Sequence, residues 1–378
     1  MTETVLKNAR LILADEIVSG AVQFRNGVIT DISSNGSAVG EDMVGDYITP
    51  GLVELHTDHL EGHYAPRPKV RWNPIAAVQA HDAQIASSGI TTVFDALRVG
   101  LDAETEIGIA DMRKLAQAIK QGVQDERLRA DHFLHLRCEV SADDCLDAFH
   151  YFDNEPLVRL ASLMDHAPGQ RQFMDVETYK VYYMRKLKTS EEEFRRYCNK
   201  RMDDSKRNSD KNRKALSALC HERNIILASH DDATLAHVEE AVEQGIRIAE
   251  FPTTQVAAEA SKKAGLSVLM GAPNIVRGGS HSGNVAARDL ASTGNLDIIS
   301  SDYIPSSLMQ SAFHLTLDVP SVSLPEAMRM ISYNPAQKVG LTDRGEIKLG
   351  KRADLVRVKL VDNIPIIRTV WREGSRVI

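Results

Sequence analysis

The stretch ITPGLVELHTDHLEGH, residues 48–63, sets three histidines and three carboxylates at the end of a short apolar run. The run itself, GLVEL, is typical of a β-strand that is buried on both faces. His56 and Asp58 lie two positions apart, so their side chains share one face if the strand continues to residue 58. The stretch therefore indicates either the rim of a metal site at a strand end or a polar loop that is rich in histidine.

Seven similar runs follow from residue 90 onward, and polar tips and helical segments separate them. Strands that alternate with helices form parallel sheets, and eight such units are typical of a closed (β/α)8 barrel. The sequence therefore predicts the α/β class and a TIM-like barrel. Its strands are expected at 51–58, 90–96, 132–139, 157–166, 224–230, 246–251, 266–273 and 296–302.

Helix signals lie between these runs. Asn73 and Pro74 predict the start of a helix that ends at Gly89, and the segment 323–340 repeats this pattern. The connection at about 168–223 is too long for a simple crossover. Because it reads as helical, with capping boxes at Thr189 and Ser190, we expect it to form a lid over the mouth of the barrel.

The two ends of the chain have a different pattern from the barrel. Residues 1–49 and 345–378 alternate polar and apolar side chains between turn signals, which indicates short antiparallel strands. These ends most simply pair with each other. The sequence therefore predicts a small β-sandwich built from both ends and a hydrolase barrel over residues 50–344.

The composition excludes several classes of protein. The chain has 45 Lys and Arg against 52 Asp and Glu, a formal charge of −7, which does not favour binding to nucleic acid or a membrane surface. No apolar run approaches the roughly 18 residues that span a bilayer. The four cysteines form no CxxC pair, so we expect reduced thiols and a cytoplasmic protein. A homo-oligomer is compatible with the sequence, which does not specify the oligomeric state.

Ligand-type side chains recur at the ends of six predicted strands, where barrel enzymes place their functional residues. Each has a structural alternative; Asp165 could cap a helix, for example, and Glu250 could pair with a lysine. Their recurrence on several strands favours a site for one or two divalent ions, and imidazole with carboxylate suits Zn²⁺, Mn²⁺ or Fe²⁺. The candidate ligands are His56, Asp58, Glu139, Asp165, His230, Glu250 and Asp302.

The motifs PGLVELHTD, ASH and SSD, followed by G-x-I-x-x-G-x-x-ADLV, resemble the amidohydrolase superfamily. This resemblance implies a metal-bearing barrel joined to a β-sandwich, with Asp302 as general base. The usual first motif of the superfamily is His-x-His, and here Asp58 takes the second position, so metal identity stays open. Two bridging ligands are considered, Lys180 and Glu139. Glu139 is favoured because Lys180 falls in a predicted helix.

Longer stretches, among them DHAPGQRQF and GAPNIVRGGSHSGNV, resemble a phosphonate-utilisation branch of that superfamily. The resemblance implies hydrolysis of the α–β phosphoanhydride of a small, anionic ribose methylphosphonate triphosphate, with release of pyrophosphate. It also implies a functional link to carbon–phosphorus lyase components. The alternative is hydrolysis of a C–N bond, as in hydantoinases and deacetylases.

Basic loops support an anionic substrate independently. Residues 185–214 contain twelve Lys or Arg against six Asp or Glu, although most of these charges suit a solvated helix surface. Arginine forks match phosphate oxygens, and the glycines of RGGSH could expose backbone N–H groups as an anion nest. The candidate substrate ligands are Arg67, Arg98, Arg171, Arg277, Ser280 and His281, and His281 is also a candidate general acid.

Overall fold

The computed structural model describes residues 3–101, 106–171, 190–280 and 283–378 of the 378-residue chain. The chain divides into two compact units. Unit 1 contains Met1–Asp95, Ala118–Phe133 and Met270–Ile378. Unit 2 contains Ala96–Gln117 and Leu134–Leu269.

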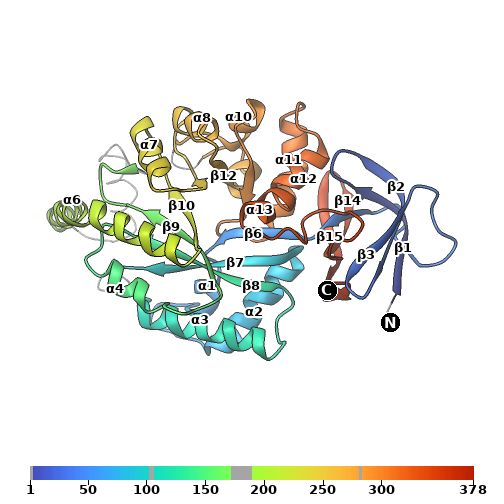
Figure 1. Ribbon diagram of the computed structural model, residues 1–378, viewed down its shortest axis with the longest axis horizontal. Helices are drawn as coiled ribbons and strands as arrows, with labels where there is room; N and C mark the ends of the chain where they lie inside the picture. Colours follow the sequence, from blue (N-terminus) through green and yellow to red (C-terminus); the bar gives the residue numbers. More distant parts are fainter. Residues whose placement is uncertain (1–2, 102–105, 172–189, 281–282) are drawn as a thin grey trace. The chain divides into compact units, whose positions relative to one another are not determined.

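An eight-stranded sheet of the barrel type runs through the middle of the sequence, with strand order β13-β12-β11-β10-β9-β8-β7-β6 (Figure 1). A parallel bridge between Thr57 and Asp302 links the end of β6 to the residues that follow β13. All eight predicted strands and the fold class are therefore confirmed. The strands are β6 (Leu52–Thr57), β7 (Ile90–Val99), β8 (Asp131–Glu139), β9 (Val158–Met164), β10 (Ile226–His230), β11 (Ile248–Glu250), β12 (Ser267–Gly271) and β13 (Ile298–Ser300).

The burial of these strands explains their apolar sequences. Every residue of β6 is buried, and in β7 only Arg98 is partly exposed. Strands that are covered on both faces tolerate polar side chains mainly at their ends. The charged residues that do occur inside these strands, Glu54 and Asp95 among them, are consequently held by hydrogen bonds.

The helix start predicted at Asn73 and Pro74 is confirmed. The Asn73 side chain accepts a hydrogen bond from the Ala76 N–H (3.1 Å) at the start of α2 (Pro74–Ser87), and Gly89 follows with a positive φ of 81°. Thr234 and Thr254 cap α7 (Leu235–Glu243) and α8 (Gln255–Lys263) in the same way. Other described helices are α1 (Leu60–Tyr64), α3 (Ile109–Gln124), α4 (Cys145–His150), α9 (Ala272–Val276), α10 (Ala287–Ser292) and α11 (Ser307–Asp318).

The segment 323–340 forms two helices rather than one continuous helix. Ser323 caps α12 (Leu324–Met330) with a capping box to Glu326, as its pattern predicted, and α13 (Tyr333–Lys338) follows a break. Pro335 explains the break because it has no N–H to donate to the carbonyl of Ile331, four residues earlier, and its ring would clash there.

The long connection contains α6 (Glu191–Glu222), which starts with a capping box between Ser190 and Glu193. Thr189 and Lys180 lie outside the described residues. One face of α6 is polar and buried: Asn208 donates to the Ser141 carbonyl oxygen (3.0 Å) and Asn212 to the Val140 carbonyl oxygen (2.9 Å). The helix is thus held against the loop after β8, and its role as a lid stays a prediction.

Both chain ends share one mixed sheet, with order β16-β15-β14-β5-β1-β2-β3 and β4 beside β1. The pairing of β5 with β14 joins the two ends, as predicted, while β1 pairs in parallel with β4 and β5. The domain limits at residues 49/50 and 344/345 stay a prediction. The strands are β1 (Glu3–Ile12), β2 (Ile17–Arg25), β3 (Val28–Ser33), β4 (Glu41–Asp42), β5 (Tyr47–Pro50), β14 (Leu355–Val361), β15 (Ile364–Arg372) and β16 (Ser375–Arg376).

A compact apolar core supports this terminal sheet. It includes Leu6, Phe24, Ile48 and Leu355, and the ring of Trp371 packs edge-on against Phe24.

Among the helices of the described ranges, none combines the length and the apolar character needed to cross a membrane.

Candidate metal centre

Two imidazoles and a carboxylate gather at the end of β10 in unit 2. Nε2 of His230 lies 3.5 Å from Oδ2 of Asp231, and Nε2 of His166 lies 3.6 Å from the same oxygen. Ligand atoms of these three residues all lie within 4.8 Å of one another. Oδ2 of Asp231 is buried and has no hydrogen-bond partner among the described residues. This donor set fits a divalent transition-metal ion.

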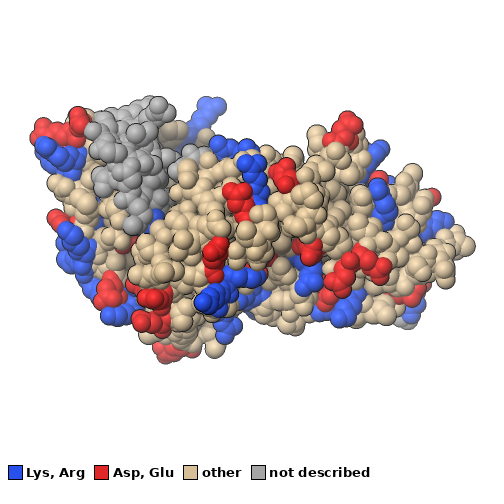
Figure 2. Space-filling model, turned by 90° about the horizontal axis from the view of Figure 1, so that it is seen from above, with Lys and Arg blue, Asp and Glu red and all other residues tan. Residues whose placement is uncertain are grey.

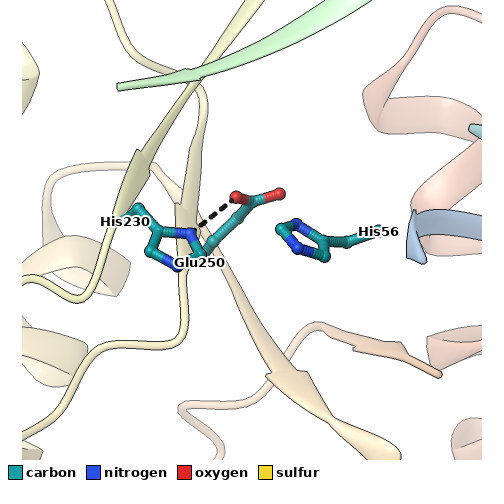
Figure 3. Close-up of side chains that lie close together, drawn as sticks. All are labelled: His56, His230 and Glu250. Atoms are coloured by element: carbon teal, nitrogen blue, oxygen red, sulfur yellow. Dashed lines mark hydrogen bonds and ion pairs between the residues drawn. The ribbon is translucent and has the colours of Figure 1, made fainter. Parts of the chain in front are cut away.

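Glu250 orients His230 from the neighbouring strand β11. Nδ1 of His230 donates to Oε2 of Glu250 at 3.2 Å, as Figure 3 shows; the figure also labels His56, which belongs to unit 1. Burial lowers the pKa of His230 despite the nearby charges of Asp231 and Glu250. The imidazole is therefore neutral, with the proton on Nδ1 and the lone pair on Nε2, the nitrogen that would bind a metal ion.

Glu139, at the end of β8, is held by several donors. Its carboxylate accepts hydrogen bonds from Nδ1 of His166 (2.7 Å), the hydroxyl of Ser141 (2.6 Å) and Nη2 of Arg201 (3.0 Å). Burial raises the pKa of Glu139, but the charge of His166, and then that of Arg201, lowers the pKa well below its usual range. Glu139 is therefore ionised, as a metal ligand must be.

In unit 1, hydrogen bonds hold the end of β6 beside the residues that follow β13. The His56 carbonyl oxygen accepts from the Ser300 hydroxyl (2.7 Å) and from the Asp302 N–H (3.1 Å). Buried Glu54 accepts from the N–H groups of His56 (2.7 Å) and Ser301 (2.6 Å). His56 and Asp302 are thereby brought together, with half-buried Asp58 two residues after His56.

Strained backbone marks three of these strand ends. Asp231 (φ 57°), Phe251 (φ 51°) and Asp302 (φ 56°) are non-glycine residues in the left-handed region, directly or shortly after β10, β11 and β13. Such conformations cost about 1–3 kcal/mol each and cluster at functional sites. Their positions agree with a site at the carboxyl ends of the strands.

Asp165 and Arg171 have other partners than the predicted ones. Oδ2 of Asp165 accepts hydrogen bonds from Ser205 (2.7 Å) and Ser209 (2.6 Å) of α6, which is closer to a structural role than to metal binding. The Arg171 guanidinium is buried and forms ion pairs with Asp232 and Glu240. A metal role for Asp165 and a phosphate role for Arg171 stay predictions.

The glycine loop after α9 does not form the anion nest that was predicted from the glycines of RGGSH. The N–H groups of Gly278 (φ 80°) and Gly279 donate to the carbonyl oxygens of Ile275 and Asn274, at 3.0 and 2.8 Å. They cap the helix and are not available as an anion nest. Arg67 and Arg277 are exposed, Arg98 and Ser280 are half-buried, and His281 lies outside the described residues.

Three residues of this region are absent from the predicted ligand set: His166, Asp231 and Arg201. His166 and Asp231 each follow a strand end within one or two residues, a signal that the sequence did offer. Arg201 had no such signal, because it lies within a helix that reads as a charged surface.

A model of the amidohydrolase family matches residues 47–377. Alpha-D-ribose 1-methylphosphonate 5-triphosphate diphosphatase of Escherichia coli (strain K12) is 46% identical over 376 residues, covering 99% of this chain and 100% of that protein. N-acetyl-D-glucosamine-6-phosphate deacetylase from Mycobacterium smegmatis is 14% identical, with a TM-score of 0.65 over 100% of both chains. Guanine deaminase from C. acetobutylicum is 12% identical, with a TM-score of 0.61 and the same coverage. These two structures show the fold alone.

Proposed function

Because this chain belongs to the amidohydrolase family, we propose that it is a metal-dependent hydrolase of the α–β phosphoanhydride of alpha-D-ribose 1-methylphosphonate 5-triphosphate. The observation that carries the proposal is the full-length, 46% identity to the E. coli diphosphatase. The products are pyrophosphate and alpha-D-ribose 1-methylphosphonate 5-phosphate.

The proposed metal ligands come from the ends of the parallel strands. They are His56, Asp58 and Asp302 in unit 1, and Glu139, His230 and Glu250 in unit 2, to which the geometry adds His166 and Asp231. One or two ions of Zn²⁺, Mn²⁺ or Fe²⁺ suit this mixture of imidazole and carboxylate. A divalent ion held there would lower the pKa of water and neutralise phosphate charge.

The protein's own groups position and deprotonate the attacking water. Asp302 accepts a proton from the water, since it follows β13 at the position of the superfamily's general base. The water oxygen bonds to the α-phosphorus, while the bond from that phosphorus to the bridging oxygen breaks. The electron pair leaves with pyrophosphate, and His281 is the candidate that protonates it.

Exposed arginines are proposed to bind the triphosphate. Arg67 and Arg277 present guanidinium groups to solvent, and Arg98 is half-buried at the end of β7. Each could form a forked pair with phosphate oxygens. Ser280 is the proposed hydroxyl donor beside them.

We further propose a cytoplasmic enzyme whose product serves carbon–phosphorus lyase components. All four cysteines are buried free thiols, which suits a reducing compartment. On the face shown in Figure 2, basic and acidic side chains are interspersed without a broad patch of either sign. This surface does not favour nucleic acid as a partner.

Product identification tests the proposal. The purified chain, supplied with Zn²⁺, Mn²⁺ or Fe²⁺, is expected to release one pyrophosphate and one ribose 5-phosphate product for each triphosphate, and a chelator should stop the reaction. Ring opening of a hydantoin, or release of the free amine from an N-acetylated sugar, without pyrophosphate from the triphosphate, would support C–N hydrolysis instead.

Metal analysis tests the proposed ligands residue by residue. His56→Ala and His230→Ala are each expected to lose bound metal relative to the native chain. His150→Ala is a suitable control, because His150 is exposed and its Nδ1 pairs with Oδ2 of Asp153, three residues later, at 3.0 Å. Full metal content in both variants would contradict the ligand assignment.

A further inference from the structure

The terminal sheet of unit 1 contains a cavity of about 540 Å³ between β1, β2 and the loop that joins β3 to β4. This volume is within the range of about 300–1,000 Å³ that is typical of small-molecule sites. None of the described residues that line the cavity is acidic. Its cationic and hydroxyl side chains are those of Lys7, Arg10, Ser19, Ser34 and Ser37.

A β-bulge places both cations of the cavity on one face of β1. The register between β1 and β2 shifts between Leu6 and Ala9, where β1 contains one extra residue. Leu6 and Ala9 both belong to the buried core, although residues three positions apart in a regular strand point to opposite faces. Lys7 and Arg10 are also three positions apart, and both line the cavity. The bulge therefore directs the two positive charges to the same side of the sheet.

Hydrogen bonds orient the two cations without neutralising them. Nζ of Lys7 donates to the Ala38 carbonyl oxygen (2.9 Å), and Nε of Arg10 donates to the Gly45 carbonyl oxygen (2.8 Å). Neither side chain forms an ion pair with a carboxylate of the described residues. Both positive charges are therefore available to an anionic ligand.

The guanidinium of Arg10 is held in place by Tyr47. Its central carbon lies 3.8 Å from the centroid of the Tyr47 ring, and its Nη1 donates to the Tyr47 hydroxyl at 3.0 Å. Nη2 of Arg10 donates to no side chain or carbonyl oxygen of the described residues. A guanidinium that is already ordered loses less conformational entropy when it binds a ligand.

Two carboxylates from the following segment of the chain have other partners. Oδ1 of Asp42 accepts hydrogen bonds from the side chain of Asn8 and the N–H of Val44, both at 2.8 Å. Asp46 accepts from Nε of Arg357 at 2.7 Å. Neither carboxylate lines the cavity, so neither occupies the place of an anion beside Lys7 and Arg10.

Neutral donors complete the lining of the cavity. The hydroxyl groups of Ser19 and Ser34 form no hydrogen bond to another described residue, and the N–H of Gly36 donates to none. Gly20 allows the end of β3 to lie close, because a Cβ at this position would collide with the Ser33 carbonyl oxygen. Cations together with hydroxyl and backbone N–H groups are the donors that bind phosphate oxygens.

We propose that this cavity binds a small phosphate-bearing anion. Lys7 supplies a point charge, Arg10 supplies a fork that matches phosphate oxygens, and the serine hydroxyls donate beside them. A diphosphate is expected to bind more tightly than a monophosphate, because it can contact both cations. None of these residues belongs to the metal or substrate ligands proposed above, so the site does not depend on the proposed hydrolysis.

Equilibrium binding of pyrophosphate to the full, metal-stripped chain tests the site. Lys7→Gln is expected to lower the affinity for pyrophosphate about 10-fold, the value of one charged hydrogen bond. Lys359→Gln makes the same change at an exposed lysine of β14 in the same sheet, and it should bind pyrophosphate as the native chain does. Arg10→Lys keeps the charge but removes the fork, and it should weaken binding less than Arg10→Gln. Thermal unfolding checks that each variant folds.

Native affinity for pyrophosphate in both Lys7→Gln and Arg10→Gln would overturn the proposal. His230→Ala and Arg277→Gln alter the proposed hydrolytic centre, and they should leave intact the binding that Lys7→Gln weakens. A loss of binding confined to His230→Ala and Arg277→Gln would assign the bound pyrophosphate to that centre and would also contradict a site on the terminal sheet. A failure of the proposed hydrolysis would not change these binding results.

Discussion

The buried carboxylate of Glu54 in β6 accepts the backbone N–H of Ser301 at 2.6 Å, directly after β13. The same carboxylate accepts the N–H of His56 at 2.7 Å. Burial raises the pKa of Glu54, and these donors lower it in part. Glu54 therefore fixes the backbone on both sides of the proposed pair His56 and Asp302 without being a ligand itself.

Replacement of Glu54 should weaken metal binding. Glu54→Gln puts an amide NH₂ where only acceptors fit, so one of the backbone donors loses its partner. Loss of supporting interactions around metal ligands typically costs 10–100-fold in affinity, and we expect a change of about that size by metal titration. Glu61→Gln, on the adjoining helix α1, is the matched control. Unchanged metal affinity in Glu54→Gln would show that the hydrogen bonds of Glu54 do not position His56 and Asp302.

Asp302 should be needed for turnover rather than for folding. General bases contribute about 10²–10⁴-fold to rate, so we expect Asp302→Asn to lower kcat for pyrophosphate release by about that factor. Its melting temperature should stay close to that of the native chain, because asparagine tolerates the left-handed backbone at this position (φ 56°) as aspartate does. Asp289→Asn, exposed on α10, provides the control. Near-native turnover in Asp302→Asn would exclude it as the base.

The barrel was predictable because its signal is local. A run such as 266–273 is largely apolar, since both faces of a parallel strand are covered, and the helices α2, α6, α7 and α8 each begin with a side-chain cap. The proposed ligand positions His56, His230 and Asp302 could be identified as strand ends for the same reason. A strand end is defined by its own sequence, and parallel strands bring such ends to one edge of a sheet.

The partners of charged side chains were not predictable. Arg171 follows a strand like a phosphate ligand, but its guanidinium pairs with Asp232 and Glu240, which lie 61 and 69 positions later. Arg201 reads as helix surface and yet is buried against Glu139. Sequence spacing shows which charges exist, whereas long-range packing decides which of them meet.

Substitution of Arg277 and of Arg171 distinguishes an arginine that binds substrate from one that stabilises the fold. Arg277→Gln removes an exposed charge, so we expect no change in melting temperature and a rise in KM for the triphosphate of about 10-fold, the value of one charged hydrogen bond. Arg171→Gln leaves buried Asp232 unpaired, and we expect a loss of about 3 kcal/mol in the free energy of unfolding. A stable Arg171→Gln chain with raised KM would restore Arg171 as a phosphate ligand.

Asp131, at the start of β8, binds three arginines of the C-terminal segment. Its oxygens lie 2.5 Å from Nη1 of Arg344, 2.6 Å from Nη1 of Arg352 and 2.9 Å from Nη1 of Arg372. Burial raises the pKa of Asp131, but the charges of Arg352 and Arg344, with their hydrogen bonds, bring it below the ordinary value of 3.8. The ionised carboxylate thus ties the start of β8 to the end of β15 and to the loop before β14.

Acid should remove this contribution to stability. A carboxyl group whose pKa is depressed on folding stabilises the protein above its unfolded pKa, and the effect is lost as pH falls through the folded pKa. We therefore expect Asp131→Asn to lower the free energy of unfolding by about 1.5–3 kcal/mol at pH 7. The difference in melting temperature between Asp131→Asn and the native chain should become smaller below about pH 4. Asp125→Asn, with a solvent-exposed carboxylate, controls for charge, and a gap that does not change between pH 7 and pH 3 would contradict an ionic role for Asp131.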